Sequence, residues 1–512
     1  MPPDMADWLP ANHLVWFLLD VVEELDTSVF HRRHPQAGPG RAAYDPDMLL
    51  ALLLYSYAVG QRSSRRVESL CVSDVGFRVI CAQDVPDHTT IARFRAVHEE
   101  AFADLFTQVL VMCARAGMGR VGVVSIDGTK VAANASRGAN RTEETLRAEA
   151  ERILGEAAAV DAAEDELFGE TRGDELPPAF ADRDGRGSRI RKALEEVDRQ
   201  RTQAEELTEV ERAHAEEYAR SLEAGAAPRG RTPKGVDPAR AARARLQRSR
   251  SRYEAASDSQ DRGTAAKDIR RAERALEEAE ALAARSSEDG DSTVTKHTQR
   301  VLNRTVQANT TDPDSKLMTT SNNGSIQGFN AQIAVSDDHL ILATDLTQDA
   351  NDVASFEPMM NAAVTAAERV LAAQPPTGDH DEEQPTGVGM ILADAGYLSG
   401  HNLTVDGPDR LIALGKNREL HREAREHPTS GPPPEDATPI EAMRHRLRSR
   451  EGAHAYKRRG ATVEPINAHL KDQVGLRRFS RRGVKAASSE LDLAAAVVNL
   501  LKLHRRTTPA VA

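Results

Sequence analysis

The sequence predicts a mixed α/β fold: a core built on a mixed sheet, an N-terminal helical domain and a long helical insertion. Two short apolar runs bounded by glycine, Val121–Ile126 and Met390–Ala393, are typical of buried strands. Helical spacing and capping residues dominate the first 118 residues, and Ala, Glu and Arg dominate residues 136–298, which favours long helices. We therefore expect a core made of residues 119–135 and 299–505, which the insertion divides.

The N-terminal domain, residues 1–118, is expected to be mostly helical. MLLALLLYSYAV follows an Asp-Pro pair, and proline suits the first turn of a helix, so this run predicts a buried helix. Further on, Asp87 to Thr90 supply N-cap residues for a helix that carries Arg93 and Arg95. Short helices followed by a capped, arginine-bearing one resemble a helix-turn-helix that reads DNA. An ordinary helical bundle with arginines as surface charges accounts for the same pattern.

The next two segments are a short strand region and the insertion. Residues 119–135 are expected to form a pair of strands around Asp127 and Gly128, a dipeptide that is also typical of a plain hairpin turn. Residues 136–298 predict long helices joined by links rich in glycine and proline. Their stripe of Leu and Ile is thin, so any coiled-coil seam is weak, and parts of the insertion are expected to be disordered.

Strand patterns return from residue 299 onward. GFNAQIAVS and HLILATDLT predict antiparallel strands, and GVGMILAD and RLIALG predict buried ones. An amphipathic helix is expected at 353–374, a loop from Pro375 to Thr386 and a surface loop at 421–440. Residues 441–505 are expected to be helical and basic.

Length and charge narrow the classes of function. At 512 residues the chain is too long for one typical domain. Its formal net charge of −12 argues against nucleic acid as a partner, yet from Glu441 onward Lys and Arg exceed Asp and Glu by roughly 10. This basic segment surrounds Glu464, so it is either a solvated face or a DNA-binding face.

Several features exclude other classes. Cys71, Cys81 and Cys113 lack metal-ligand spacing, which indicates a reducing compartment and no structural zinc. HLVWFLLDVV is short and interrupted by an aspartate, so we expect a core helix and not a membrane span, and no basic region suggests a signal peptide. The sequence contains no GxxxxGK[ST], which implies no ATP-driven step.

Three acidic residues carry the chemistry that the sequence indicates. Asp127 and Asp394 each end a predicted strand, and Glu464 lies in a stretch with helical spacing. Carboxylate oxygens are ligands that Mg²⁺ prefers, and two Mg²⁺ ions about 3.5–4 Å apart activate the attacking oxygen and stabilise the leaving oxygen of a phosphodiester. The three side chains are therefore expected to converge on one metal site that cuts and rejoins phosphodiester bonds.

The chain resembles the DDE transposases of bacterial insertion sequences, whose catalytic core has a ribonuclease-H-like fold. The resemblance covers residues 10–135 and 300–505 and not the stretch between them. It rests on YDPDMLLALLLYSYAVGQRSSRRVE, PDHTTIARFR, SIDGTKVAANAS, NTTDPDSKLM, GFNAQIAVSDDHLILATDLTQDANDVASFEPMM, LADAGYLSG and a Tyr-Arg-Glu-Lys signature at Tyr456, Arg459, Glu464 and Lys471. Arg459 departs from this signature, because it lies one residue further from the glutamate than the family's arginine does. Arg458 is a neighbouring candidate but breaks the tyrosine spacing.

The resemblance implies a metal-dependent enzyme acting on DNA. Asp127, Asp394 and Glu464 would be the catalytic residues and the ligands of two Mg²⁺ ions, with Mn²⁺ as a substitute. The implied DNA contacts, with the predicted helix-turn-helix included, are Tyr456, Arg459, Lys471, Arg93 and Arg95. The implied partners are double-stranded DNA at the transposon ends and target, and further copies of the chain in a homo-oligomer on DNA, with no membrane. The implied location is the bacterial cytoplasm, at the nucleoid.

The same resemblance constrains the insertion. A ribonuclease-H-like sheet must pair the strand of Asp127 with the strands near 328–347. The insertion is therefore expected to leave and re-enter the core at nearby points, which long loops allow at little entropic cost.

Alternatives stay open for several residues and for the function. Lys471 is either a phosphate contact or an exposed lysine, and a structural or DNA-contacting role suits His469 better than that of a general base, since a metal-activated water needs none. A defective relative that binds DNA without cutting is disfavoured because all three acids are present, whereas a structural protein and a nuclease without strand transfer are further alternatives. Turn-forming or capping roles are expected for the other acids, of which Asp352 is the most family-like: Asp312, Asp314, Asp345, Asp349 and Asp352.

Overall fold

The computed structural model divides the chain into two compact units. One joins Met1–Ala139 to Asp314–Ala512, so the N-terminal helices and the sheet belong together, and the other is Asn140–Pro313. The described residues are 5–32, 43–152, 186–225, 236, 238–256, 259–287, 307–320, 324–376, 386–415 and 418–508.

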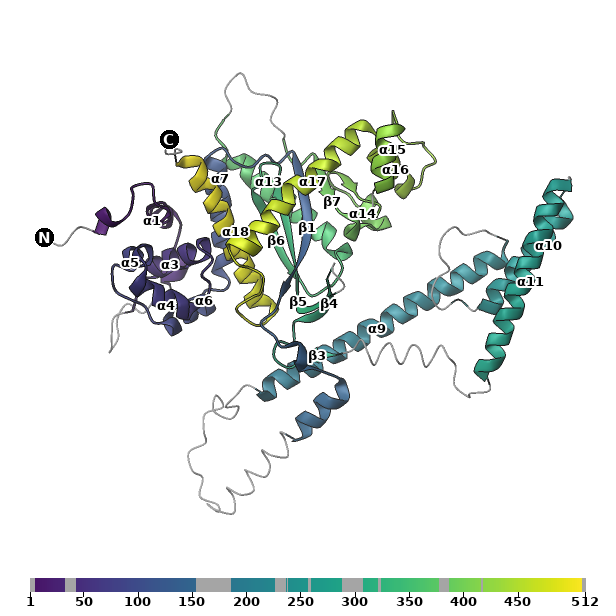
Figure 1. Cartoon of the computed structure of the whole chain (residues 1–512), viewed down its shortest axis with the longest axis horizontal. Coiled ribbons are helices and arrows are strands. Elements are labelled where there is room, and N and C mark those ends of the chain that lie inside the picture. Colours follow the sequence, from purple (N-terminus) through teal and green to yellow (C-terminus); the bar gives the residue numbers. More distant parts are fainter. Residues whose placement is uncertain are drawn as a thin grey trace, which may run out of the picture. The chain divides into compact units, whose positions relative to one another are not determined.

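A mixed sheet forms the centre of the first unit (Figure 1). Its strands are β1 (Val123–Ala132), β4 (Lys316–Thr319), β5 (Ser325–Ser336), β6 (Ile341–Thr347), β7 (Met390–Ala393) and β8 (Asp409–Ile412). Among the described residues these six strands have the order β4-β5-β1-β7-β8, and β6 also pairs with β5. β1 is antiparallel to β5 and parallel to β7, which in turn is parallel to β8. This order confirms the predicted mixed α/β class and the predicted strands from residue 325 onward.

β1 is one continuous strand, so the predicted pair of strands around Asp127 and Gly128 is wrong. The strand pairs with β5 all the way from Val124 to Ala132. The Asp-Gly dipeptide favours a turn, but continuous pairing with a neighbouring strand outweighs that local tendency.

The core lies where helices cover this sheet. β5 is buried from Gln327 to Ser336, as expected for a strand with neighbours on both sides. Helix α18 (Val484–Thr507) packs against β6 and against α7 (Ala101–Arg115). Its Asn499 accepts a hydrogen bond from the Ile341 amide at 3.0 Å and donates one to the Ile341 carbonyl at 2.9 Å. α18 therefore satisfies backbone groups of β6 that an open sheet edge would expose.

The N-terminal region is helical, as predicted, and two of its helices begin at the predicted caps. Asp45 accepts a hydrogen bond from the amide of Asp47 at 3.1 Å at the start of the buried helix α3, and Asp87 accepts from Thr89 and Thr90 at the start of α6. The elements of this region are η1 (Met5–Trp8), α1 (Leu14–Glu24), α2 (Ser28–His31), α3 (Pro46–Ala58), α4 (Ser64–Ser73), α5 (Val75–Ile80), α6 (His88–Val97) and α7.

The C-terminal part of the first unit is mainly helical, and one of its helices lies where a loop was predicted. α15 occupies part of 421–440, where a surface loop was predicted, because its charged residues favour a helix as much as a loop. Most of the predicted loop from Pro375 to Thr386 lies outside the described residues. Besides the N-terminal helices, the helical elements of the first unit are η2 (Arg137–Ala139), η3 (Val353–Ser355), α13 (Phe356–Ala373), η4 (Ala395–Tyr397), α14 (Gly400–Thr404), α15 (Arg418–Glu426), α16 (Pro439–Arg448), α17 (Arg450–Ala468), the π turn η5 (His469–Gln473) and α18.

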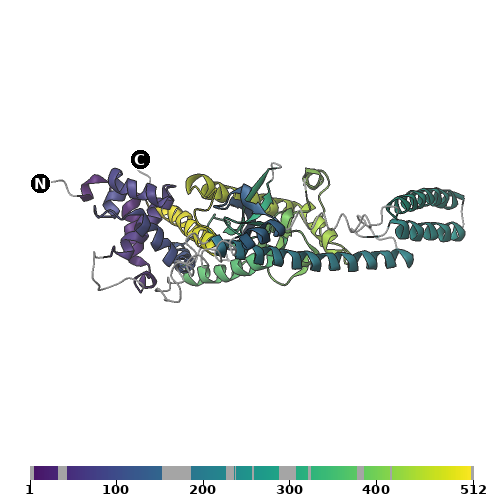
Figure 2. The ribbon, with the colours of Figure 1, turned by 90° about the horizontal axis from the view of Figure 1, so that it is seen from below.

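The second unit consists mainly of long helices, as predicted for the insertion. α10 (Pro238–Ala255) and α11 (Ser259–Ser287) lie side by side (Figures 1 and 2), and Arg243 pairs with Glu280 at 2.8 Å. The other elements are α9 (Arg186–Glu223), β2 (Asn140–Arg141) and β3 (Ala308–Asn309). β2 and β3 are antiparallel, so the first and last strands of this unit lie next to each other, as the prediction of nearby exit and entry points required.

None of the described helices combines the length and the apolar character that crossing a bilayer requires.

One buried acid of the core makes stability depend on pH. Burial raises the pKa of Asp492 on α18 to about 6, with the negative charge of Asp345 adding to the effect and the Thr344 hydroxyl, at 2.6 Å, opposing it. An ionised Asp492 is therefore less favourable in the folded than in the unfolded chain. Its ionisation should lower the free energy of unfolding as the pH rises from about 4 to about 6.

We predict that Asp492→Asn, which keeps an acceptor for Thr344, stabilises the first unit above pH 6 by up to about 3 kcal/mol and has little effect near pH 4. Urea unfolding followed by the fluorescence of Trp8 and Trp16 at pH 4.5 and 7.5 measures this difference. Asp436→Asn, on the exposed surface, is the control. A gain that is the same at both pH values would contradict the prediction.

Candidate active site

The register of β1 and β7 brings two of the predicted acids together. Ser125 pairs with Leu392, and two residues further on the strands reach Asp127 and Asp394. Arg459 of α17 pairs with both: its Nη2 lies 2.6 Å from Asp127 Oδ1 and 3.6 Å from Asp394 Oδ2. Only 14% of each side chain, Asp127 and Arg459, is exposed, so this is a largely buried ion pair.

α17 and the following turn η5 are held against β1 by the side chains of Arg459, Asn467 and Lys471, of which the sequence did not single out Asn467. Asn467 lies two helical turns beyond Arg459 on the same face, and its Nδ2 donates to Asp127 Oδ2 at 2.7 Å. Lys471 donates to the hydroxyl of Thr129, which lies on the same face of β1 as Asp127. Both carboxylate oxygens of Asp127 therefore have a donor from α17. The oxygen of the Asn467 amide, Oδ1, is buried with no hydrogen-bond partner among the described residues.

Pro465 interrupts the hydrogen bonding of α17 one residue after Glu464. Proline has no N–H, so the carbonyl of Ala461 loses its helical partner. The Nε2 of His339 lies 3.0 Å from that carbonyl and replaces it. The helix then continues into the π turn η5, so the seven residues from Glu464 to Lys471 are not the two regular α-helical turns that were expected.

Glu464 is exposed on α17, and among the described residues it does not form a group with Asp127 and Asp394 whose carboxylate oxygens all lie within 4.8 Å of one another. Gly460, one turn earlier, leaves room beside it: a Cβ there would lie 3.2 Å from Glu464 Oε1. The structure thus brings Asp127, Asp394, Arg459 and Lys471 into one site and leaves Glu464 on the helix that borders it.

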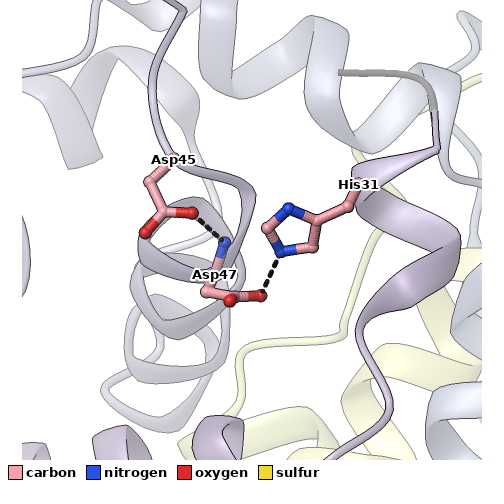
Figure 3. Close-up of side chains that lie close together, drawn as sticks. All are labelled: His31, Asp45 and Asp47. Carbon is pink, nitrogen blue, oxygen red and sulfur yellow. Dashed lines mark hydrogen bonds and ion pairs between the residues drawn. The ribbon is translucent and has the colours of Figure 1, made fainter. Parts of the chain in front are cut away.

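Elsewhere among the described residues, potential metal-ligating atoms of His31, Asp45 and Asp47 lie within 4.8 Å of one another (Figure 3). Asp45 caps α3, and Asp47 Oδ1 lies 3.0 Å from His31 Nε2. Helix capping and a half-exposed ion pair account for all three side chains.

Asp352 also lies at the site, and its side chain does not cap η3, the role that was expected. Its Oδ1 instead accepts hydrogen bonds from Asn330 Nδ2 and Gln332 Nε2, each at 2.8 Å. Gln332 in turn accepts a hydrogen bond from the Tyr397 hydroxyl. Asn330 and Gln332 are two residues apart on the buried strand β5 and therefore lie on the same face, so both amides can reach the same carboxylate.

The electrostatics of the site are dominated by burial and by negative charge. The pKa of Asp127 is raised to about 6, chiefly by burial; Arg459 opposes this effect, and the negative charges of Asp394 and Asp352 add to it. The carboxylates raise the pKa of Arg459, although burial alone would lower it. Burial lowers the pKa of Lys471 and raises that of Tyr456. The site is therefore a place where an additional cation is favourable.

The other predicted DNA contacts fall into two groups. Arg93 is exposed on α6, whereas Arg95 is 8% exposed and donates to the Ser64 hydroxyl at 2.7 Å and the Arg62 carbonyl at 3.1 Å. The guanidinium of Arg95 thus joins α6 to the start of α4, and the DNA contact predicted for Arg95 stays a prediction. Tyr456 is half-buried and packs against the cluster of Leu392, Leu411, Met443 and Leu447.

His469 has a structural place at the start of η5. It is 9% exposed, and burial lowers its pKa to about 4, with Arg505 and Lys502 adding to the effect. The imidazole is thus neutral and only weakly basic at pH 7, which suits the expected structural or DNA-contacting role better than that of a general base.

Comparison with known families identifies the class of protein. A family model described as Transposase domain (DUF772) matches residues 3–97, and one described as Transposase DDE domain matches residues 434–504, which include Glu464 and Lys471. No curated protein and no solved structure shows a significant match to the chain. Together the two matches support an insertion-sequence DDE transposase, and the DDE domain implies that the mixed sheet is a ribonuclease-H-like core. The family also implies a divalent metal and DNA as a partner.

Gly128, next to Asp127, allows the close approach of Asp352. A Cβ at this position would overlap Asp352 Oδ1 and lie 2.6 Å from Gln332 Nε2. Replacing glycine by alanine in a strand normally stabilises it, but here the new methyl group meets two side chains that hold each other in place.

We predict that Gly128→Ala destabilises the first unit by about 1–3 kcal/mol, the usual cost of overpacking. Gly138→Ala is the matched control, because the nearest atom to a Cβ there is Ser136 Oγ at 3.8 Å. Urea unfolding compares the two variants. Equal stability would show that Asp352 and Gln332 move aside at no cost.

Proposed function

We propose that this transposase cuts DNA at the ends of an insertion sequence and joins the freed 3′ ends to target DNA, as a metal-dependent polynucleotidyl transferase. The observation that carries the proposal is the register of β1 and β7, which sets Asp127 beside Asp394, with α17, the helix of Glu464, bonded to both oxygens of Asp127. The match of residues 434–504 to a transposase DDE domain supports the role of Glu464.

We propose Asp127, Asp394 and Glu464 as the ligands of two Mg²⁺ ions, with Mn²⁺ as a substitute. The residues fit such ions, because carboxylates are hard oxygen donors and Asn467 Oδ1 offers an unpartnered oxygen beside Asp127. When bound, the ions activate the attacking oxygen and stabilise the leaving oxygen of the phosphodiester. Water attacks in the first step, and the freed 3′-hydroxyl attacks target DNA in the second.

The cations of α17 and η5 would hold the DNA backbone at this site. Arg459 presents a fork of donors that suits phosphate oxygens, and the Lys471 ammonium lies at the Thr129 hydroxyl, two residues from Asp127. Tyr456 adds a half-buried ring whose hydroxyl is the only polar group it offers to DNA. The role of Glu464 requires α17 to bring it closer to the aspartates than it lies here.

The remaining segments would serve DNA recognition and assembly. We propose residues 1–118 as the domain that reads the terminal DNA, with Arg93 on the exposed side of α6. Residues 119–135 and 299–505 would form the catalytic core, and the charged helices of 136–298 would contact DNA or a second copy of the chain in a homo-oligomer.

If the three acidic residues are catalytic, replacing them should lower DNA cleavage and leave DNA binding largely unchanged. Asp127→Ala, Asp394→Ala and Glu464→Ala should each lower Mg²⁺-dependent cleavage of transposon-end DNA by at least about 100-fold, the upper end of what loss of an outer-shell partner costs. Binding of the same DNA should change little, since each substitution removes a ligand and no phosphate-binding cation. Cleavage on a gel and binding by fluorescence anisotropy measure the two effects.

Glu451→Ala is the control for charge on α17, since Glu451 is exposed in its first turn. A variant that keeps full cleavage would remove its residue from the site. Cleavage by the wild type without joined target products would favour a nuclease that lacks strand transfer.

Because α17 carries exposed cations, we expect the affinity for DNA to depend on the salt concentration. Lys457 and Arg450 are exposed, whereas Arg458 pairs with Asp337 and Lys471 contacts Thr129. The double variant Arg450→Glu/Lys457→Glu should weaken DNA binding and flatten the slope of log K against log salt by about 0.9 for each phosphate that the protein no longer neutralises. Arg369→Glu, exposed on α13, is the control for the change in net charge. An unchanged slope would make both cations ordinary solvated charges.

A further inference from the structure

We propose that Asp352 is an additional carboxylate ligand of the metal site, beyond Asp127, Asp394 and Glu464. The inference rests on the proposed function, since it adds a residue to the same site. Asp352 reaches the site from the connection between β6 and α13, a part of the chain that both matched segments leave out.

The first observation is that one oxygen of Asp352 is fixed and the other is not. Oδ1 accepts two hydrogen bonds, from Asn330 and Gln332, both at 2.8 Å. These amides are 2% and 0% exposed, so β5 holds them rigidly. No donor among the described residues contacts Oδ2. A hydrogen-bonding role needs only Oδ1 and would be served by an uncharged asparagine, so it leaves the charge and the second oxygen of Asp352 unexplained.

The second observation is that the free oxygen shares a small space with Asp394. A Cβ at Gly396 would lie 2.8 Å from Asp352 Oδ2 and 2.9 Å from Asp394 Oδ1. Glycine at this position therefore keeps open a space between the two carboxylates that any side chain would fill. Gly128, beside Asp127, lets the other oxygen of Asp352, Oδ1, lie even closer to the backbone of β1. Asp352 is thus flanked by Gly128 and Gly396, and each of these glycines lies within two residues of a proposed metal ligand.

The third observation concerns charge. Three carboxylates, those of Asp127, Asp352 and Asp394, lie in this part of the site, and Arg459 pairs with the first and the third among the described residues. Carboxylates this close repel each other unless a cation lies among them. Both oxygens lie within 3 Å of the position that a Gly396 Cβ would take, and a divalent ion held there by oxygen ligands would supply the missing charge. The geometry therefore assigns Asp352 Oδ2 to the ion held by Asp394.

Metal binding without DNA tests this assignment. Titration calorimetry of the full chain with Mn²⁺ would compare the wild type with Asp352→Asn, which keeps the acceptor for Asn330 and Gln332 and removes the charge. We expect Mn²⁺ affinity to fall by at least about tenfold. In EDTA the same variant should unfold at an unchanged or higher temperature, because it relieves repulsion among the carboxylates. A merely structural Asp352 predicts the reverse: a lower unfolding temperature in EDTA and unchanged Mn²⁺ affinity.

A second pair of variants leaves Asp352 itself intact. Gly396→Ala places a methyl group between Asp352 and Asp394 and should also weaken Mn²⁺ binding, whereas Gly400→Ala, with nothing within 4 Å of its Cβ, should not. Asp127→Asn and Asp394→Asn separate this inference from the proposed function. If they abolish Mn²⁺ binding while Asp352→Asn and Gly396→Ala leave it within twofold of the wild type, the role of Asp352 is refuted and the site stands. If Asp127→Asn and Asp394→Asn also bind Mn²⁺ normally, the metal site itself is refuted.

Discussion

The parallel pairing of β1 with β7 is the constraint on which the rest of the candidate site depends. It fixes Ser125 opposite Leu392, so that Asp127 and Asp394 follow at the same level of the sheet. A slip of one residue would turn Asp127 to the opposite face and away from α17. The pairing with β7 is short, but β5 holds β1 in a single register from Val124 to Ala132 on its other edge. The long antiparallel ladder therefore secures the geometry that the short parallel one creates.

The site gathers negative charge in a place where charge is costly. A carboxylate as buried as Asp127 is unfavourable unless donors compensate it, and α17 supplies Arg459 and Asn467, one for each oxygen. The compensation is incomplete, because Asp394 and Asp352 lie near enough to raise the pKa of Asp127. A site with surplus negative charge, rigid oxygen atoms and glycine-lined space is built to receive a cation. The same electrostatics explain why Arg459 pairs with the two aspartates.

The sequence predicted the strands and their aspartates because those signals are local. An apolar run that ends in Asp127 or Asp394 needs no distant partner to be recognised, and the caps Asp45 and Asp87 act on amides two or three residues away. The strand pair at 119–135 was mispredicted because an Asp-Gly turn signal cannot reveal that β5, about 200 residues further on, pairs with the whole segment.

The sequence predicted the hydrogen-bond partners of individual side chains less well than it predicted the strands. Arg95 has the spacing of a surface arginine, yet it binds Ser64 and Arg62; Asn467 lies between two residues of the predicted signature and gives no pattern of its own.

The backbone pairing of the insertion was likewise not visible in the sequence. Its first and last strands pair, Asn140 with Asn309, so a long excursion closes within its own unit. β1 and β5 then meet as if a short connection joined them, because closure entropy grows only with the logarithm of loop length. A large insertion can thus sit between two paired strands without disturbing the register that aligns Asp127 with Asp394.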